Sequence, residues 1–296
     1  MNILITGSEG NIGRRLADYL QGYHNIYCID IKQDFRPYYK TVDVNDPMDL
    51  LDVFDTFKPE VVFHLAAMVS RVTCEISPST TISTNVGGTN NIIQLCKKYN
   101  AKLMNFSTSE VYGNQGGELS ESSILHPNNL YGVSKMLAEQ LVNYERVNGL
   151  RAINIRPFMF YDEEESIGSN RSAMIRWAEA LLNREKIDVH IGAMRSWLHI
   201  QDGVKILEKL MYADDHTINV GSPSVYEMSF IAKLMCEKIG IGYSDYINST
   251  PLPDKMTLTK FPDLSIQTRK APITFEYDIE TGISLVIDNL RKRQSI

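Results

Sequence analysis

The chain has 296 residues, of which 43% are hydrophobic and 22% charged, with a formal net charge of −6 and a pI of about 5.6. A chain of this length can bury a large core, as one large α/β unit or as a domain with a smaller partner. The acidic balance provides no basic face of the kind that nucleic acid or an anionic membrane requires. The longest apolar run, VVFHLAAMV at 61–69, is too short to span a membrane.

The first residues and the cysteines indicate a cytoplasmic protein. MNILITGSEG has no basic region and no cleavage pattern, so we expect no signal peptide. Four scattered cysteines lack CxxC spacing and are expected to be free thiols in a reducing compartment: Cys28, Cys74, Cys96 and Cys236. The histidines also lack metal-ligand spacing, so no metal site is expected, and His64 is interpreted as a hydrogen-bonded core residue.

The first half of the chain alternates short β-branched runs with helix-like segments. Strands are expected at 2–6, 25–30, 61–66, 102–108 and 151–157, and helices near 11–21, 47–57, 80–99 and 131–148. Continuous apolar strands separated by helices predict a doubly wound α/β fold with a parallel sheet.

After Pro157 the pattern loosens. Helices are expected over 171–184, 203–213, 229–240 and 278–293, with extended pieces at 187–192, 195–202 and 216–221. The second half therefore predicts a smaller lobe that follows the large sheet.

The segment NILITGSEGNIGRRLADYL predicts a strand, a tight turn and a helix. The turn carries Gly7, Gly10 and Gly13, which let the main chain approach a pyrophosphate at the helix N-terminus. Asp30 ends the second strand, where a carboxylate binds ribose hydroxyls and repels a 2′-phosphate, so NAD is favoured over NADP. Lys32 argues for NADP instead, because a nearby basic side chain can bind the 2′-phosphate. Asp43, which ends a third short strand, is suited to meet the adenine amino group.

Two polar stretches predict one catalytic site. Tyr131 and Lys135 stand four apart on a predicted helix and share one face. A neighbouring ammonium favours the phenolate and is expected to lower the pKa of the tyrosine from its ordinary value near 10. Thr108 follows a long strand, at the carboxyl edge where such sheets hold ligands, and can align a substrate hydroxyl with Tyr131. Glu110 is either an acid or base toward a neighbouring carbon or a structural carboxylate.

These motifs resemble the extended short-chain dehydrogenase/reductase superfamily, in its NAD-dependent nucleotide-sugar epimerase/dehydratase family. The similarity covers nearly the full length, through TGSEGNIG, HLAA, TNVGGTNNIIQLC, STSEVYG, YGVSK, RPF and RSWLHIQD. It implies a Rossmann-type sheet with a smaller C-terminal α/β substrate lobe. It also implies an NAD that oxidises C4 of a sugar carried on UDP, GDP or dTDP to a 4-keto intermediate.

The resemblance also implies domain bounds and partners. The NAD-binding domain is expected over 1–157, with returning segments about 197–222, and the substrate lobe over 158–196 and 223–296. The partner is a nucleotide-diphosphate sugar, and a homodimer is expected through the helices at 80–99 and 131–148.

By match to the family's motifs, Thr108, Tyr131 and Lys135 are the catalytic trio, with Glu110 as a further candidate. The cofactor contacts implied are Gly7, Glu9, Gly10, Asn11, Ile12, Gly13, Asp30, Ile31, Asp43, Val44, Leu65, Ala66, Ala67, Asn85, Ser107, Tyr131, Lys135 and Pro157. The substrate contacts implied are Ser109, Met68 and Arg195, the last as a clamp on the diphosphate.

Departures from the family's pattern rank the reactions. Ser109 stands where dehydratases carry an aspartate, so a 4-epimerase is favoured, with a decarboxylase or a 4,6-dehydratase as alternatives. Decarboxylation calls for a basic residue facing the sugar carboxylate, for which Arg71 and Arg171 are candidates. An NADPH-dependent 4-keto-sugar reductase and a catalytically silent NAD-binding regulatory protein are further alternatives. Met159 replaces an expected asparagine, and the acidic stretch 162–165 is either a solvated loop or faces a cationic group such as an amino sugar.

Overall fold

The computed structural model describes residues 1–168, 171–214, 216–253 and 256–294. The chain forms two compact units. The first contains 1–113, 124–157 and 207–219, and the second contains 114–123, 158–206 and 220–296. The expected division into a cofactor domain and a substrate lobe stays a prediction. Within the expected bounds, residues 169–170, 215, 254–255 and 295–296 lie outside the described residues.

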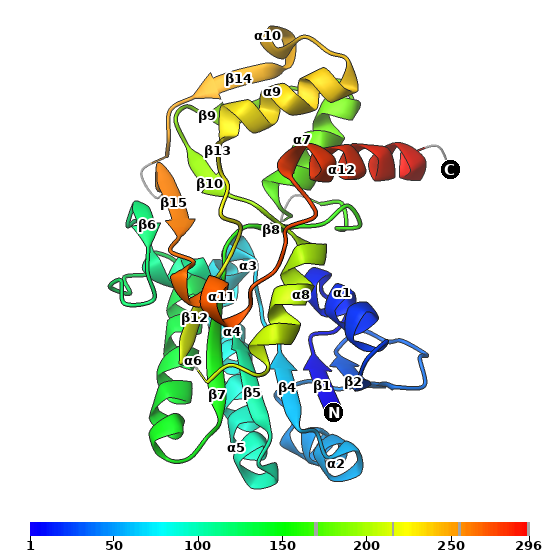
Figure 1. Ribbon diagram of the computed structural model, residues 1–296, viewed down its shortest axis with the longest axis vertical. Helices are drawn as coiled ribbons and strands as arrows, with labels where there is room; N and C mark the ends of the chain where they lie inside the picture. The colour runs from blue at the N-terminus through cyan, green and yellow to red at the C-terminus, as the bar shows by residue number, and fades with distance from the viewer. Residues whose placement is uncertain (169–170, 215, 254–255, 295–296) are drawn as a thin grey trace. The chain divides into compact units, whose positions relative to one another are not determined.

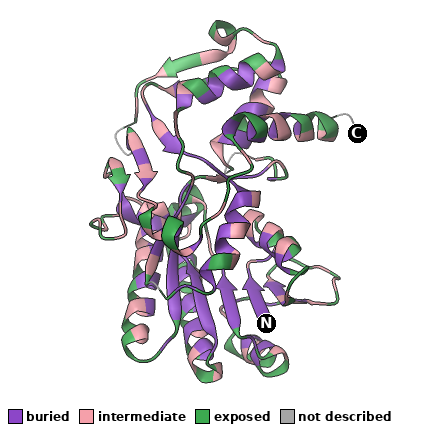
Figure 2. Ribbon diagram, viewed as in Figure 1, coloured by how far each residue is buried: buried purple, intermediate pink, exposed green. Residues whose placement is uncertain are grey.

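A seven-stranded sheet forms the centre of the first unit (Figure 1). Its order is β12-β7-β5-β4-β1-β2-β3, and the pairs from β7 through β3 are parallel. The strands are β1 (Asn2–Thr6), β2 (Asn25–Asp30), β3 (Tyr39–Thr41), β4 (Val61–His64), β5 (Lys102–Phe106), β7 (Ala152–Pro157) and β12 (Thr217–Val220). The predicted parallel α/β sheet is confirmed, and its central strands are buried (Figure 2).

Helices cover both faces of this sheet. The helices of the first unit are α1 (Asn11–Leu20), α2 (Pro47–Phe57), α3 (Arg71–Ile76), α4 (Pro78–Ile82), α5 (Thr89–Tyr99) and α6 (Leu130–Val147), and α8 (Ile200–Leu210) has residues in both units. Neighbouring side chains of a strand point to opposite faces of the sheet, so they belong to different parts of the core. Leu4 belongs to an apolar cluster with Phe54, Ile92 and Val142 of α2, α5 and α6. Ile3 is buried outside that cluster, as the opposite side-chain direction in a strand requires.

Local side-chain chemistry sets where these helices begin and bend. Asp46 caps α2 by accepting from the N–H of Met48 at 2.9 Å, and Pro47 is the first helical residue. The expected single helix over 80–99 is instead α4, a π-helical turn (Ser83–Gly88) and α5. Thr89 Oγ1 donates to the carbonyl of Asn85 at 2.7 Å within this region. A side chain that binds the helix backbone in this way accompanies a local change of pitch.

The second unit contains a four-stranded sheet, two small strand pairs and a helical cluster. The sheet has the order β13 (Val225–Glu227), β10 (Met194–Ser196), β15 (Thr259–Pro262) and β6 (Gly117–Leu119). The pairs are β11 (Leu198–His199) with β8 (Phe160–Tyr161), and β14 (Ile247–Thr250) with β9 (Ile187–His190). The helices are α7 (Ala173–Leu182), α9 (Met228–Ile239), α10 (Tyr243–Tyr246), α11 (Ser265–Lys270) and α12 (Ile279–Gln294). Helices α7, α9 and α12 share one apolar core.

One stretch of the second half differs from the sequence-based expectation. The stretch 195–202 is not extended throughout, because α8 begins at Ile200.

The four cysteines are free and buried, as expected. Among the described residues, no helix is both long enough and apolar enough to cross a membrane.

Candidate active site

The turn between β1 and α1 forms a narrow cradle of main chain. Gly7 has a φ of +70°, and its N–H donates to the carbonyl of Ile29 at 2.9 Å. A Cβ on Gly13 would lie 2.3 Å from the carbonyl oxygen of Gly7, and one on Gly7 would lie 2.5 Å from the nitrogen of Ala66. Only glycine fits these two positions without a backbone shift. No side chain of the described residues caps the start of α1, so its N–H groups suit a pyrophosphate.

The next cofactor candidates lie beside this cradle. Asn11 and Ile12 are the first residues of α1. Asp30 ends β2, where its Oδ2 accepts from the N–H of Glu9 at 3.0 Å and its Oδ1 accepts from the N–H of Lys32 at 3.1 Å. The structure thus brings the carboxylate expected at the ribose into direct contact with the glycine turn.

Candidates for the adenine follow β2 and β3. Ile31 is largely exposed, and Val44 is buried. Asp43 is exposed and lies beyond the end of β3 at Thr41 rather than closing the strand. Its Oδ1 accepts from the N–H of Asn45 at 2.9 Å.

The loop after β4 is fixed by hydrogen bonds to the helix that precedes α5. Ala66 N–H donates to Thr6 Oγ1 at 3.2 Å, while Leu65 and Ala67 lie on either side of it. Met68 N–H donates to Asn85 Oδ1 at 2.8 Å, and Asn85 Nδ2 donates back to the carbonyl of Met68 at 3.0 Å. Both the oxygen and the nitrogen of the Asn85 amide therefore bind this loop, so the direct cofactor contact expected of Asn85 stays a prediction.

Asn85 also connects this loop to the catalytic helix. Its Nδ2 donates to Ser134 Oγ at 2.9 Å, and Ser134 Oγ donates to the carbonyl of Tyr131 at 2.8 Å. Ser134 was not among the candidates derived from the sequence, because its role depends on a partner 49 residues away. It stands between Tyr131 and Lys135 in the sequence, which is the one signal that could have singled it out.

His64 is a structural core histidine, as expected. Its Nδ1 is 2.8 Å from Thr6 Oγ1 and its Nε2 is 3.0 Å from Thr89 Oγ1. Burial, and next the charge of Lys135, lower the pKa of His64 to about 3, so the ring is neutral at physiological pH. A neutral ring can bridge the two threonines with one donor and one acceptor nitrogen.

The catalytic candidates meet at the carboxyl edge of the sheet. Thr108 follows β5 and is buried, and its Oγ1 accepts from the N–H of Glu110 at 3.2 Å. Burial raises the pKa of Tyr131, a hydrogen bond with Thr108 lowers it, and the charge of Glu110 raises it, with a net increase above the ordinary value. For the protein without bound ligand the net shift is upward, opposite to the decrease expected from a neighbouring ammonium, because burial dominates.

Lys135 is a buried ammonium on the same helix as Tyr131. Its exposed fraction is 2%, and burial lowers its pKa to about 8 although Glu139 raises it. Glu139 is itself 0% exposed and binds Arg156 through both oxygens, at 2.9 and 2.7 Å. Arg156 also donates to the hydroxyl of Tyr112 at 2.9 Å. Sequence reasoning missed this pair, although Glu139 repeats the four-residue spacing of Tyr131 and Lys135.

Glu110 is tied to the start of the catalytic helix. Its carboxylate accepts from Arg71, and its Oε2 accepts from Asn129 Nδ2 at 3.0 Å. Asn129 is the N-cap of α6 and accepts from the N–H of Gly132 at 2.9 Å. Glu110 therefore has the contacts of a structural carboxylate, and it also lies near Tyr131, so both interpretations stay open.

Ser107 shows that the residues present fit a bound cofactor. It is buried beside Thr108, and its Oγ has no hydrogen-bond partner among the described residues. A buried hydroxyl without a partner is costly, so a ligand that supplies one is expected. The glycine cradle, Asp30 and Ser107 together suit a dinucleotide, and Pro157 ends β7 at the same edge of the sheet.

Arg195 belongs to the second unit and is largely bound to the main chain. It is 7% exposed, and its guanidinium donates to the carbonyls of Met194 at 2.7 Å, Leu258 at 3.0 Å and Thr257 at 2.6 Å. The diphosphate contact expected of Arg195 stays a prediction. Ser109 begins the short 3-10 helix Ser109–Tyr112 of the first unit.

The acidic stretch 162–165 is solvated only in part: Glu164 is exposed, but the interpretation as a solvated loop is wrong for its other residues. Asp162 and Glu165 are buried, and Glu165 Oε1 accepts from the N–H of Ser172 at the start of α7, at 2.9 Å. Glu163 Oε2 lies 3.0 Å from His199 Nε2. Burial raises the pKa of Glu163, but its hydrogen bond with His199 lowers it, to a net value of about 2. These carboxylates are engaged within the second unit.

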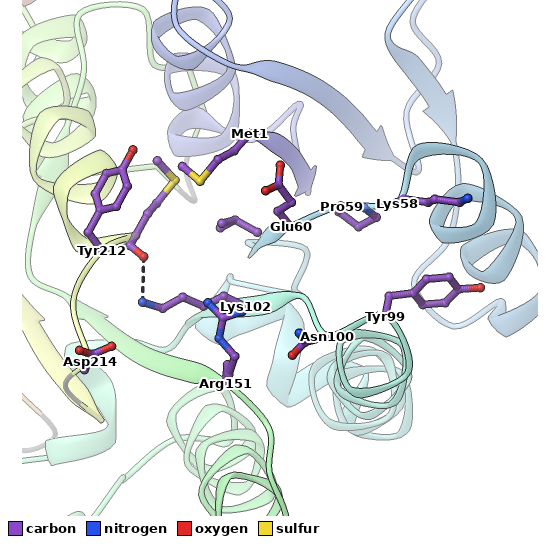
Figure 3. A pocket seen from close by; sticks show the side chains of 12 residues that line it. Met1, Lys58, Pro59, Glu60, Tyr99, Asn100, Lys102, Arg151, Tyr212 and Asp214 are labelled. Atoms are coloured by element: carbon purple, nitrogen blue, oxygen red, sulfur yellow. Dashed lines mark hydrogen bonds between the residues drawn. The ribbon is translucent and has the colours of Figure 1, made fainter.

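A pocket of about 550 Å³ opens at the other, amino edge of the large sheet (Figure 3). Lys102, at the start of β5, extends along it and donates to the carbonyl of Met211 at 2.8 Å and to that of Ala213. These carbonyls follow the C-terminus of α8, where a cation is favourable. None of the candidate site residues lines this pocket, and Lys102 serves there as a structural cap.

A glycine cradle, an acidic residue after the second strand and a Thr, Tyr and Lys at the carboxyl edge define a dinucleotide-dependent enzyme of the Rossmann class. The sequence matches the NAD dependent epimerase/dehydratase family over residues 3–221, and the chain belongs to this family. NAD is accordingly its cofactor.

Individual proteins of known name agree with this assignment. The chain is 30% identical to GDP-6-deoxy-D-talose 4-dehydrogenase of Aggregatibacter actinomycetemcomitans, over 80% of each chain. It is 29% identical to UDP-glucuronic acid decarboxylase 5 of Arabidopsis thaliana, over 81% of this chain and 75% of that one. The structure of UDP-glucose 4-epimerase from Thermotoga maritima with UDP-glucose superposes with a TM-score of 0.90, at 22% identity, over 99% of this chain and all of that chain.

Proposed function

We propose that the protein is a nucleotide-sugar 4-epimerase that oxidises C4 of a sugar carried on a nucleoside diphosphate and then reduces the 4-keto sugar on its other face. The observation that carries this proposal is the group formed by Thr108, Tyr131 and the buried Lys135 at the carboxyl edge of the sheet. The names of two similar proteins, a 4-dehydrogenase and a 4-epimerase, also refer to position 4.

Each residue of this group has a distinct task in the proposed reaction. The phenol of Tyr131 takes the proton of the C4 hydroxyl, and the Thr108 hydroxyl orients that hydroxyl toward it. Burial opposes this step, because it raises the pKa of Tyr131. The phenolate must therefore be stabilised as it forms by the charge of Lys135 and by the positive nicotinamide ring of the bound cofactor. NAD, when bound, accepts hydride from C4 and returns it. Ser107 and the glycine turn hold the cofactor.

Decarboxylation is the second candidate, and one contact favours it. Arg71 binds Glu110 near Tyr131, and its side chain is 48% exposed, so a guanidinium stands within reach of an incoming carboxylate. Against it, that guanidinium already has a carboxylate partner. Release of carbon dioxide from a nucleotide-linked uronic acid would replace the epimerase proposal with this one.

The test compares Tyr131→Phe with Tyr144→Phe. Tyr144 is on the same helix but is 66% exposed, so its substitution controls for the loss of a phenol from α6. Removal of a general base costs about 100- to 10,000-fold in rate, so we expect that loss for Tyr131→Phe and none for Tyr144→Phe. The measurement is the single-turnover conversion of UDP- and GDP-sugars by enzyme that retains NAD. Equal activity of the two variants would overturn the assignment of Tyr131.

Two further expectations stay proposals: one rests on the family resemblance, and the other on the first residues and the free cysteines of the sequence. We propose a homodimer through the helices at 80–99 and 131–148, and a cytoplasmic location. Light scattering and cell fractionation test them independently of the chemistry.

A further inference from the structure

The carboxylate of Glu9 lies between two guanidinium groups at the glycine turn. Its side chain is 5% exposed, and both of its oxygens are engaged. Arg14 Nη2 donates to Oε2 at 2.7 Å, and Arg36 Nη2 donates to Oε1. Arg14 is on α1 and Arg36 is in the loop between β2 and β3, so Glu9 joins two segments that flank the cofactor cradle.

Glu9 lies directly beside Asp30, the carboxylate expected to bind the ribose hydroxyls. Its N–H donates to Asp30 Oδ2 at 3.0 Å, and Lys32 Nζ lies 3.4 Å from its carbonyl oxygen. In folds of this class, an acid at the end of the second strand binds the ribose 2′-hydroxyl, whereas a nearby arginine accommodates the 2′-phosphate of NADP. Arg14 and Arg36 are present here, and Glu9 pairs with both of them through its two oxygens.

Arg36 is held in place by more than Glu9. Its Nε lies 2.9 Å from Asp34 Oδ2, and its guanidinium carbon lies 5.3 Å from the ring centre of Tyr39 and 5.7 Å from that of Tyr38. None of these contacts involves Glu9, so we expect the guanidinium to stay in place when the charge of Glu9 is removed. A guanidinium released there binds phosphate oxygens in bidentate fashion.

We propose that Glu9 is a second selectivity determinant, which acts with Asp30 to exclude NADP. It does so in two ways: it occupies the arginines that would bind a 2′-phosphate, and it adds a negative charge where that phosphate would lie. The inference rests on the cofactor site of the proposed function and adds the residue that decides between the two dinucleotides.

The test measures dissociation constants of NADH and NADPH from cofactor fluorescence, with full-length protein freed of nucleotide. Glu9→Gln removes the charge and keeps the size of the side chain. We expect it to lower the ratio of the NADPH to the NADH dissociation constant at least tenfold, which corresponds to about 1.4 kcal/mol. Asp18→Asn, an exposed carboxylate on the same α1, should leave the ratio unchanged. Glu9→Gln combined with Arg36→Ala should lose most of the gain.

Two results would overturn the proposal. One is an unchanged ratio in Glu9→Gln with both nucleotides still bound. The other is an equal loss of affinity for both nucleotides, which would assign Glu9 to the stability of the turn. Failure of the wild-type protein to bind either nucleotide would instead refute the cofactor site, and this inference would fall with it.

Discussion

Lys135 is expected to destabilise the folded protein, because its charged ammonium is buried at the proposed catalytic site. Its ammonium is 2% exposed, and burial lowers its pKa from 10.5 to about 8. Below pH 8 the side chain is charged in both states and the folded state bears the full cost of burying that charge. Between pH 8 and 10.5 the unfolded chain binds the proton and the folded one does not, so the cost fades as pH rises.

The size of this cost follows from the two pKa values. One pH unit of pKa difference corresponds to about 1.4 kcal/mol, so the cost at pH 6.5 is on the order of 3 kcal/mol. Lys135→Met keeps an unbranched apolar chain of similar length, and Glu139 retains Arg156 as its partner. We therefore expect Lys135→Met to abolish activity but to raise the free energy of unfolding at pH 6.5 by up to this amount.

The assay is urea denaturation at pH 6.5 and at pH 9.5, with nucleotide removed from both proteins. The gain should be smaller at pH 9.5. Lys97→Met is the control, because Lys97 is 30% exposed and pairs with Glu145 at the surface, so its effect should be small at both pH values. A loss of stability in Lys135→Met at pH 6.5, or a gain that does not change with pH, would refute the reasoning.

Two other substitutions test the cradle and the buried ion pair. Gly13→Ala places a Cβ against the carbonyl of Gly7, so we expect NAD to be lost on purification, with destabilisation of about 1–3 kcal/mol in thermal unfolding; full NAD retention would contradict the close approach. Glu139→Gln leaves the buried Arg156 without a counter-charge and should cost about 3–5 kcal/mol in urea unfolding. Glu145→Gln on the same helix should cost less than about 1 kcal/mol. Similar losses for the two glutamates would show that burial is not the cause.

The sequence predicts the large sheet well because its strands are continuous apolar runs. β1 and β2 begin and end at the expected residues, and α2 spans 47–57 as expected. The π-helical turn before α5 could not be foreseen, since it accompanies contacts of Asn85 with residues far along the chain. In the second unit the strands have only two to four residues, too few for an alternating pattern to be recognised.

The candidate site divides in the same way. Thr108, Tyr131 and Lys135 are recognisable because their spacing is local or follows a long strand. Ion pairs such as Glu139 with Arg156, and Glu9 with Arg36, join segments that come together only in the folded chain. Their charges could be read from the sequence, but their partners could not.

The central claim is that hydride leaves C4 of the sugar and returns to it. Proton NMR in D₂O, with a panel of UDP-, GDP- and dTDP-sugars and enzyme that retains NAD, tests this most directly. The account predicts a new C4 epimer that carries no deuterium, since the hydrogen returns from the cofactor. Deuterium at C3 or C5, or loss of water or of carbon dioxide, would contradict it and direct attention to Glu110.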